Sequence, residues 1–372
     1  MQFTIAKDEL LRGLSRAQSV IEKKSTLPIL SNIMMDAAGD TVTLVATDLE
    51  VGVRSVCEAS VESRGSITVG AKKLFEICKE LDGDEIKFKV LPNDWVEISC
   101  DAFSSRLVGL SADDFPVLPS TDAELQFSLN GSVVGAMIDK TQFAISTNET
   151  RYYLNGVYFL TCEVDGKKAL RMVATDGHRL SLFGKELPEG MEVDIDGVII
   201  PKKGVAEIRK LVAETDGDLS IGIKERTIIV KRSDVELIIR LIDGEYPEYD
   251  QVIPKNNDKT VTCRLDSLVH ALRRVAVMAT ELNKGVRVAI KRGALQLSCN
   301  NPNLGAAEEA LEAQYDGSAL EIGFNARYLL DVLGVVDSED VILEFSDPLS
   351  PCVVRMPSDP GFLAVIMPMR LE

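Results

Sequence analysis

Apolar residues recur along the chain at two spacings, and each spacing predicts a type of element. Residues 7–22 carry apolar side chains three and four positions apart, which is the pattern of a helix with one buried face. The segments 131–146 and 266–281 have the same pattern. Runs such as TVTLVAT at 41–47 and ERTIIVKR at 225–232 instead alternate, which predicts strands with one buried face.

Three landmarks in this pattern recur in the same order, at intervals of about a third of the chain. The first is a strand that ends in a small polar turn, at Ala46, Ala174 and Cys299, 128 and then 125 positions apart. The second is a strand that leads into a helix, at Gly70, Pro201 and Phe324, 131 and then 123 positions apart. The third is a strand that reaches an aromatic residue or methionine before proline, in GLSADDFPVLP, LIDGEYPEYDQVIP and LAVIMPMRL. These near-constant offsets indicate three copies of one unit.

Each copy contains two predicted helices among many strands. Helices gathered on one side of antiparallel sheet form an α+β fold, which is the class that we predict. The joints between copies fall in proline-containing stretches. We therefore predict three repeated domains, at 1–121, 122–254 and 255–372.

The net charge of −17 argues at first against a nucleic-acid partner, but the charge is unevenly distributed. The six predicted helical segments hold 19 Lys and Arg against 12 Asp and Glu, so the acidic excess lies elsewhere. If the helices share one side of the sheets, that side can contact phosphates without reading bases. The alternative is a solvated helix surface of mixed charge, because Lys and Arg are good helix formers.

Catalytic motifs are absent from the sequence. It contains no phosphate-binding glycine loop, HExxH or GxSxG. The run ATDGHRL at 174–180 places Asp176 near His178, but the parallel run ATDLE at 46–50 has no histidine. We interpret the shared ATD as a turn device and expect no catalytic residue and no cofactor. A hydrolase that uses Asp176 and His178 is the alternative.

Cysteine usage and hydropathy exclude further classes. The 7 cysteines are scattered without a CxxC pair, and with only 2 histidines they predict buried, reduced thiols and no metal site. No apolar stretch approaches the length of a membrane span, and the start MQFTIAKDELL lacks the order of a signal peptide. We expect a cytoplasmic protein without a membrane partner.

Several runs together resemble one family. TLPILSN at 26–32, RYYLNG at 151–156, ATDGHRL, PKKGV at 201–205, YPEYDQVIPK at 246–255 and the terminal MPMRL are similar, in order, to the bacterial sliding clamps, the β subunits of replicative DNA polymerase III. The resemblance implies two chains joined head to tail into a closed ring, with helices inside and sheets outside. It implies a processivity factor that encircles duplex DNA and serves the replicative polymerase, the clamp loader and repair proteins.

The resemblance also implies three sets of site residues. A pocket between the second and third domains would bind a partner's short linear motif through Leu154, Thr175, Gly177, His178, Arg179, Leu180, Pro247, Val252, Val365, Ile366, Met367, Pro368, Met369 and Arg370. DNA would be contacted by Lys24, Asn148, Arg151, Tyr152, Tyr153, Lys202 and Lys203. The dimer interface would include Lys72, Lys73, Arg106, Leu107, Val277, Met278, Glu308 and Glu309.

Simpler roles stay open for some of these residues. The C-terminal LAVIMPMRL is also a good buried closing strand, and the two tyrosines could pack at a strand edge. Gln251, Pro351 and Glu372 depart from the family pattern near the pocket. A scaffold of the same fold that recruits proteins but barely touches DNA is a second alternative.

Overall fold

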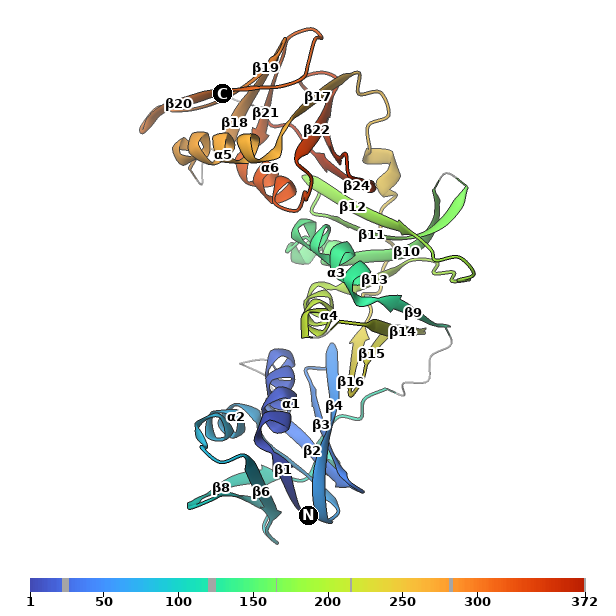
Figure 1. Cartoon of the computed structure of the whole chain (residues 1–372), viewed down its shortest axis with the longest axis vertical. Coiled ribbons are helices and arrows are strands. Elements are labelled where there is room, and N and C mark those ends of the chain that lie inside the picture. Colours follow the sequence, from blue (N-terminus) through green and yellow to red (C-terminus); the bar gives the residue numbers. More distant parts are fainter. Residues whose placement is uncertain (22–26, 120–124, 165, 215, 281–283, 371–372) are drawn as a thin grey trace. The chain divides into compact units, whose positions relative to one another are not determined.

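A computed structural model describes residues 1–21, 27–119, 125–164, 166–214, 216–280 and 284–370. One order of ten elements occurs three times within them: strand, helix, four strands, helix, three strands (Figure 1). This order confirms the three repeated units and the α+β class that the landmarks predict.

The three series have closely similar lengths. The first comprises β1 (Gln2–Ala6), α1 (Lys7–Val20), β2 (Asn32–Ala38), β3 (Thr41–Thr47), β4 (Val51–Ser63), β5 (Gly65–Gly70), α2 (Ala71–Glu80), β6 (Glu85–Val90), β7 (Trp95–Cys100) and β8 (Phe103–Leu110). The second comprises β9 (Leu125–Asn130), α3 (Gly131–Asp139), β10 (Gly156–Val164), β11 (Lys167–Thr175), β12 (Arg179–Glu186), β13 (Val198–Pro201), α4 (Lys202–Glu214), β14 (Asp218–Lys224), β15 (Thr227–Arg232) and β16 (Val235–Arg240). The third comprises β17 (Lys259–Arg264), α5 (Leu265–Val275), β18 (Gly285–Lys291), β19 (Ala294–Asn301), β20 (Gly305–Glu312), β21 (Leu320–Asn325), α6 (Ala326–Leu333), β22 (Asp340–Phe345), β23 (Cys352–Met356) and β24 (Asp359–Ile366).

All three helices that open a series are shorter than their apolar patterns predict. The helix α1 ends at Val20, and α3 and α5 give way to the 3-10 turns η3 (Gln142–Ala144) and η6 (Ala276–Met278). At the end of α3 the Thr141 hydroxyl donates to the Met137 carbonyl at 2.7 Å. A side chain that bonds to the preceding turn in this way competes with continued helix.

The chain forms two compact units, and the middle series is divided between them. The first unit holds residues 1–132 and 203–241, and the second holds 133–202 and 242–372. In the first unit one twelve-stranded sheet has the order β1-β6-β7-β8-β5-β2-β3-β4-β16-β15-β14-β9. In the second unit the sheets have the orders β13-β10-β11-β12-β24-β23-β22-β17 and β20-β19-β18-β21.

Two equivalent strand pairs join neighbouring series into continuous sheets. The fourth strand of the first series, β4, pairs antiparallel with the last strand of the second, β16, with Val51 opposite Ile239. The corresponding strands β12 and β24 pair in the same way, with Arg179 opposite Ile366. The sheets therefore cross the domain boundaries that the sequence predicts.

The two helices of the first series pack as a pair against the sheet, and those of the third series pack on each other. The helix α1 buries Leu10 and Leu14 against β3 and β4, and it lies beside α2 (Figure 1). Gly13 permits this close approach, because a Cβ there would lie 2.5 Å from the Leu44 side chain. The helices α5 and α6 pack on each other in the second unit, with Leu272 among the buried residues.

Candidate functional site

The turn between β11 and β12 is held by the side chains of the ATD run. The Thr175 hydroxyl donates to the Arg179 carbonyl at 2.7 Å and accepts from the Gly177 N–H at 3.1 Å. Asp176 Oδ1 accepts from the backbone N–H groups of His178 and Arg179 at 2.9 and 3.0 Å. Gly177 has a φ of +87°, a conformation that side-chain-bearing residues rarely adopt. The interpretation of ATD as a turn device agrees with this geometry.

The same contacts count against a hydrolase built on Asp176 and His178. The second oxygen of Asp176 accepts from Arg179 Nε at 3.1 Å, so both carboxylate oxygens serve the turn. The His178 ring instead stacks on Tyr328, with ring centroids 6.0 Å apart. This arrangement gives the histidine a packing partner rather than a carboxylate that would orient it as a base.

Arg179 lies beneath this turn and is only 9% exposed. Its guanidinium donates to Asp331 Oδ2 at 2.5 Å and to the Phe143 carbonyl at 2.7 Å. It also lies over the rings of Phe143 and Tyr328 at 5.3 and 4.6 Å. The contacts of Arg179, a residue of the predicted pocket, tie β12 to η3 and α6.

An apolar floor lies beside the turn. Leu154, Leu180 and Val365 are buried in one cluster with Tyr246 and Tyr249. Leu180 and Val365 are directly opposite each other on β12 and β24. The structure thus brings together residues from three distant parts of the predicted pocket.

Several other predicted pocket residues are exposed around this cluster. His178, Gly177 and Pro247 are exposed, as are Val252 and Met367, the last two by 52% and 40%. The Met367 N–H donates to the His178 carbonyl at 2.9 Å, which continues the β12–β24 pairing past Ile366. The site therefore has a buried apolar base and an accessible apolar margin.

The C-terminal run continues into a neighbouring cleft. Ile366 is fully buried as the closing strand residue, whereas Pro368, Met369 and Arg370 line a cleft of about 500 Å³ with Leu349 and Gly323. The Met369 N–H donates to the Gly323 carbonyl at 2.8 Å. Leu349 is 75% exposed there, and no sequence pattern predicted it as a site residue.

Two residues that depart from the family pattern, Gln251 and Pro351, lie in the described part of the chain. Gln251 is exposed and donates to Glu248, and the Pro351 carbonyl accepts from Asn257 at 3.3 Å. Glu372 lies outside the described residues.

Most of the predicted DNA-contacting residues surround η4 (Glu149–Leu154). Asn148 caps this turn by accepting from the Thr150 N–H at 2.9 Å, and Arg151 is exposed. Tyr152 is 55% exposed and meets Tyr153 edge to face, whereas Tyr153 packs on the apolar cluster. The backbone N–H of Lys202 donates to the Asn155 carbonyl at 3.0 Å, which places Lys202 beside this turn. The Lys202 side chain is exposed there. Lys24 lies outside the described residues.

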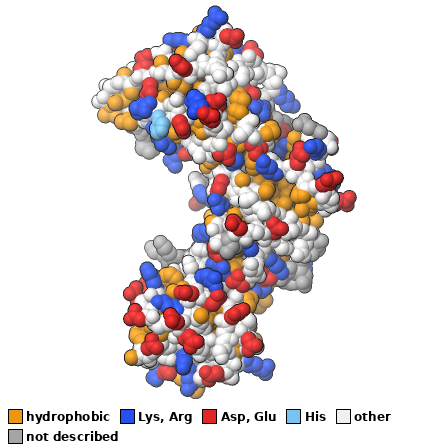
Figure 2. Space-filling view, in the orientation of Figure 1, with side chains coloured by type: hydrophobic (Ala, Val, Ile, Leu, Met, Phe, Trp, Pro, Cys, Tyr) orange, Lys and Arg blue, Asp and Glu red, His pale blue; other side chains and the backbone are white. Residues whose placement is uncertain are grey.

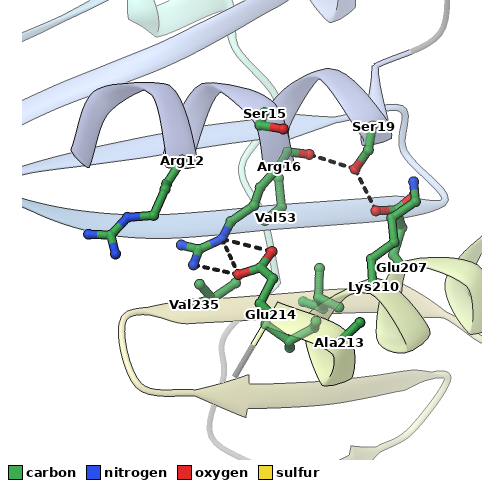
Figure 3. Close-up of a pocket in the computed structure, with 12 residues that line it drawn as sticks. Arg12, Ser15, Arg16, Ser19, Val53, Glu207, Lys210, Ala213, Glu214 and Val235 are labelled. Carbon is green, nitrogen blue, oxygen red and sulfur yellow. Dashed lines mark hydrogen bonds and ion pairs between the residues drawn. The ribbon is translucent and has the colours of Figure 1, made fainter. Parts of the chain in front are cut away.

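Lys203 and several other helix cations form ion pairs within the chain. Lys203 donates to Asp48 and, at 2.6 Å, to the Val20 carbonyl at the end of α1. Figure 3 shows Arg16 of α1 bonded to Glu214 of α4, at 2.7 Å, beside Arg12 and Lys210. On the face seen in Figure 2, basic and acidic side chains are interspersed. The count of 19 helix cations therefore overstates the positive charge that these helices offer to a ligand.

The predicted interface residues are mostly accessible. Lys72 and Val277 are exposed by 85% and 70%, while Leu107 and Met278 are half-buried. Arg106 pairs with Glu97 at 2.9 Å and Lys73 with Glu76 at 2.6 Å. Glu308 bonds to Gln296, and Glu309 accepts from Arg274 Nε at 2.8 Å, which lowers the pKa of Glu309. For these charged residues to pair across a dimer interface, they must first break the ion pairs and hydrogen bonds that they form within the chain.

Six of the seven cysteines are buried, and Cys162 is half-buried. Burial raises the pKa of Cys57 to about 11 and that of Cys78 to about 12. Among the described residues no group of three or more His, Cys, Asp or Glu could hold a metal ion. No helix in the described part of the chain is long and apolar enough to span a bilayer.

Comparison with known families decides what this architecture is. The N-terminal, central and C-terminal domain families of the DNA polymerase III β subunit match residues 1–119, 128–248 and 250–370. The chain belongs to the β sliding clamp family. It is thus a processivity factor for DNA polymerase rather than a catalyst.

Similar clamps cover the whole chain. The β sliding clamp of Caulobacter vibrioides is 40% identical over 100% of both chains. A solved clamp from Bartonella birtlesii, bound to griselimycin, has a TM-score of 0.94 at 38% identity and covers 100% of both chains. A Caulobacter crescentus clamp with polyethylene glycol at a putative β-motif tethering region has a TM-score of 0.95 at 39% identity, covering 100% of this chain and 99% of its own.

Proposed function

We propose that two copies of this chain close head to tail into a ring around duplex DNA, and that polymerases, the clamp loader and repair proteins dock a short motif at the β12–β24 joint. Each chain would contribute domains 1–121, 122–254 and 255–372. The helices would line the hole and the sheets would form the rim. Such a ring holds DNA by topology, so its contacts to phosphates can be weak and exchange during sliding.

The repeated sheet joint is the observation that carries this proposal. The fourth strand of one series pairs with the last strand of the next at both β4–β16 and β12–β24. In the third series the equivalent fourth strand, β20, stands at a sheet edge. The last strand of the first series, β8, pairs with β5 only at Gly109 and Leu110, so most of its length has a free edge. Pairing β20 of one chain with β8 of another would repeat the joint and close the ring without an open edge.

The predicted interface residues fit this third joint. Arg106 and Leu107 lie on β8, and Glu308 and Glu309 lie on β20. Val277 and Met278 lie in η6, which packs against β20, and exposed apolar side chains there supply area to bury. Lys72 and Lys73 add charges, but exposed pairs contribute only about 0–1 kcal/mol each.

The β12–β24 joint is suited to a short apolar motif. Its exposed margin includes Met367, and methionine adapts to different partners because its side chain is flexible and polarisable. Griselimycin and polyethylene glycol are bound in two solved relatives, which supports an accessible site on this fold. We assign the fourteen predicted pocket residues to this site, with Arg179 as a positioning residue beneath the turn.

DNA contact would use the side chains around η4 and the start of α4. Arg151, Tyr152 and Lys202 are exposed there, and cations next to aromatic rings suit phosphates and sugars. Asn148 and Tyr153 shape this turn. Lys203 is engaged by Asp48, so its contribution would require that this pair opens. Lys24 completes the predicted set.

Retention on circular DNA tests the ring directly. The protein is loaded on nicked circular DNA with a loader and ATP, and the circle is then linearised. Rapid loss on linearisation is expected, because a ring slides off an end; persistence on linear DNA would contradict encirclement. The matched control is Leu107→Asp, which places a charge at the proposed joint. This variant should sediment as a monomer and stay off both DNA forms, whereas an unchanged dimer would reject the β8–β20 joint.

A further inference from the structure

The β4–β16 joint in the first unit repeats the turn of the peptide site. The Thr47 hydroxyl donates to the Val51 carbonyl at 3.1 Å and accepts from the Leu49 N–H at 3.0 Å. Asp48 Oδ1 accepts from the backbone N–H groups of Glu50 and Val51 at 2.9 and 2.7 Å. These are the same four hydrogen bonds that Thr175 and Asp176 make at the β12–β24 joint. The two turns therefore correspond residue by residue.

A cavity of about 420 Å³ opens at this first joint. Its lining includes Thr47, Gly52 and Ile238, which occupy the positions of Thr175, Leu180 and Val365 in the peptide site. Pro116 stands in the proline-containing segment after the last strand of its series, as Pro247 does in the next. The cavity is thus the counterpart, one repeat earlier, of the site proposed to bind peptides.

The apolar lining of this cavity differs from that of its counterpart. Gly52 leaves the floor without a side chain, and Leu118 lies against it, since a Cβ on Gly52 would be 2.7 Å from Leu118 Cδ2. Leu49 is 52% exposed at the turn where the counterpart has Gly177. Leu49, Leu118 and Ile238 all line the cavity and offer it apolar contacts.

The charged lining differs as well. Arg240 and Arg226 line the cavity, and Arg240 takes the position of Met367 in the counterpart. Glu50 takes the position of His178 and is the acidic group of the lining. Two guanidinium groups against one carboxylate favour an anionic group on an occupant, and a guanidinium can hold a carboxylate through two parallel hydrogen bonds.

We propose that this cavity is a second peptide-binding site, specific for an extended segment in which an apolar residue adjoins acidic residues. The apolar side chain packs on Leu49, Leu118 and Ile238, and the adjoining carboxylates meet Arg240 and Arg226. The inference rests on the proposed function, because it takes the β12–β24 joint as a peptide site. Its ligand differs from that of the first site, since Arg240 and Glu50 replace Met367 and His178.

A labelled peptide of this chemistry tests the proposal. The probe is fluorescein-Gly-Ser-Asp-Glu-Leu-Ile-Ser-Gly, and a second peptide with Lys-Lys in place of Asp-Glu is the charge control. Fluorescence anisotropy with the full-length protein should show saturable binding of the acidic peptide below about 1 mM. The Lys-Lys peptide should bind at least about tenfold more weakly. No saturable binding of the acidic peptide, or equal binding of both, would overturn the proposal.

Three variants locate the binding. Arg240→Glu should lower the affinity for the acidic peptide by about tenfold or more, because it reverses the charge that meets the peptide's carboxylates. Arg292→Glu, an exposed arginine in the β18–β19 turn, is the matched charge control and should bind as the native chain does. Met367→Ser should also bind normally, because it alters only the other joint. Equal binding by Arg240→Glu, or loss in Met367→Ser, would overturn the assignment.

Retention on circular DNA separates this inference from the proposed function. Arg240→Glu should stay on circular DNA and leave linear DNA as the native chain does. If the native chain fails that assay, the ring is wrong whatever the peptide does. If it passes and Arg240→Glu binds the peptide unchanged, the second site alone is wrong.

Discussion

At the β4–β16 joint the first residue after the turn is Val51, which is fully buried, whereas the same position at the β12–β24 joint holds Arg179. The backbone around both is the same: a Thr-Asp turn, then an antiparallel pair to the last strand of the next series. The buried Val51 side chain requires only apolar neighbours to pack against. Arg179 needs Asp176 of its own turn, and also Asp331 and the Phe143 carbonyl, which come from two other places in the fold.

A second contrast lies five residues further along the same strands. The Val56 N–H donates to the Asp234 carbonyl at 2.8 Å, and the Asp234 carboxylate accepts a hydrogen bond from Arg16. The equivalent pair in the second unit is Gly184 and Gly361, and a Cβ on Gly361 would lie 2.1 Å from the Gly184 carbonyl oxygen. The repeat therefore preserves backbone pairing while each joint acquires its own side-chain contacts. That difference allows one joint to serve as a binding site without requiring the same ligand at the other.

The largest expected effect comes from Arg179→Ala. Removing one partner of a buried ion pair leaves the other uncompensated, so the free energy of unfolding should fall by about 3 kcal/mol. In a double-mutant cycle with Asp331→Ala, urea unfolding followed by circular dichroism should give a coupling energy of about 2 kcal/mol.

The control for this cycle is the Arg287–Glu321 pair on β18 and β21, whose side chains are 48% and 59% exposed. Its coupling energy should stay below about 1 kcal/mol, because solvent screens exposed pairs. Equal coupling in both pairs would mean that Arg179 contributes no more than a surface cation does.

Gly361→Ala should have the next largest effect. The added methyl group meets a backbone carbonyl that cannot rotate away, so the strands must separate, at a cost of about 2 kcal/mol. Asp234→Ala, at the equivalent position, should cost less than about 1 kcal/mol, because it removes only a partly exposed ion pair with Arg16.

The readout distinguishes the two units. Trp95, the single tryptophan, lies on β7 in the first unit, so its fluorescence transition should be unchanged in Gly361→Ala. A Gly361→Ala protein with native stability would show that β12 and β24 are less closely paired than the structure has them.

The repeat was readable in the sequence because backbone pairing depends on periodicity and turn chemistry. Alternating apolar residues and the ATD runs at 46–48 and 174–176 predict strands and turns from local residues alone. The ends of the opening helices were less predictable, because the Thr141 hydroxyl and its neighbours compete with the helix in a way that apolar spacing does not record.

The site was only partly readable because its contacts are non-local. The family resemblance supplied Leu180, Val365 and Met367, which the fold does bring together. Tyr328, which stacks on His178 and lies over Arg179, sits on a helix that shows only an ordinary apolar stripe. The predicted helical segments carry an excess of cations, but their number does not reveal that Arg16 is paired with Glu214. Charge partners are set by tertiary structure, and composition does not contain them.

The smallest expected effect is also the closest test of equivalence between the joints. Thr47→Val and Thr175→Val each remove a hydroxyl that accepts from one backbone N–H and donates to one carbonyl. Each should lower the free energy of unfolding by about 1 kcal/mol, since the lost hydrogen bonds are the same. The loss in Thr47→Val should appear in the Trp95 fluorescence transition, and that in Thr175→Val only by circular dichroism. If one substitution costs about 1 kcal/mol and the other nothing, the two turns share a shape but not a role, and the comparison between the joints fails at its first residue.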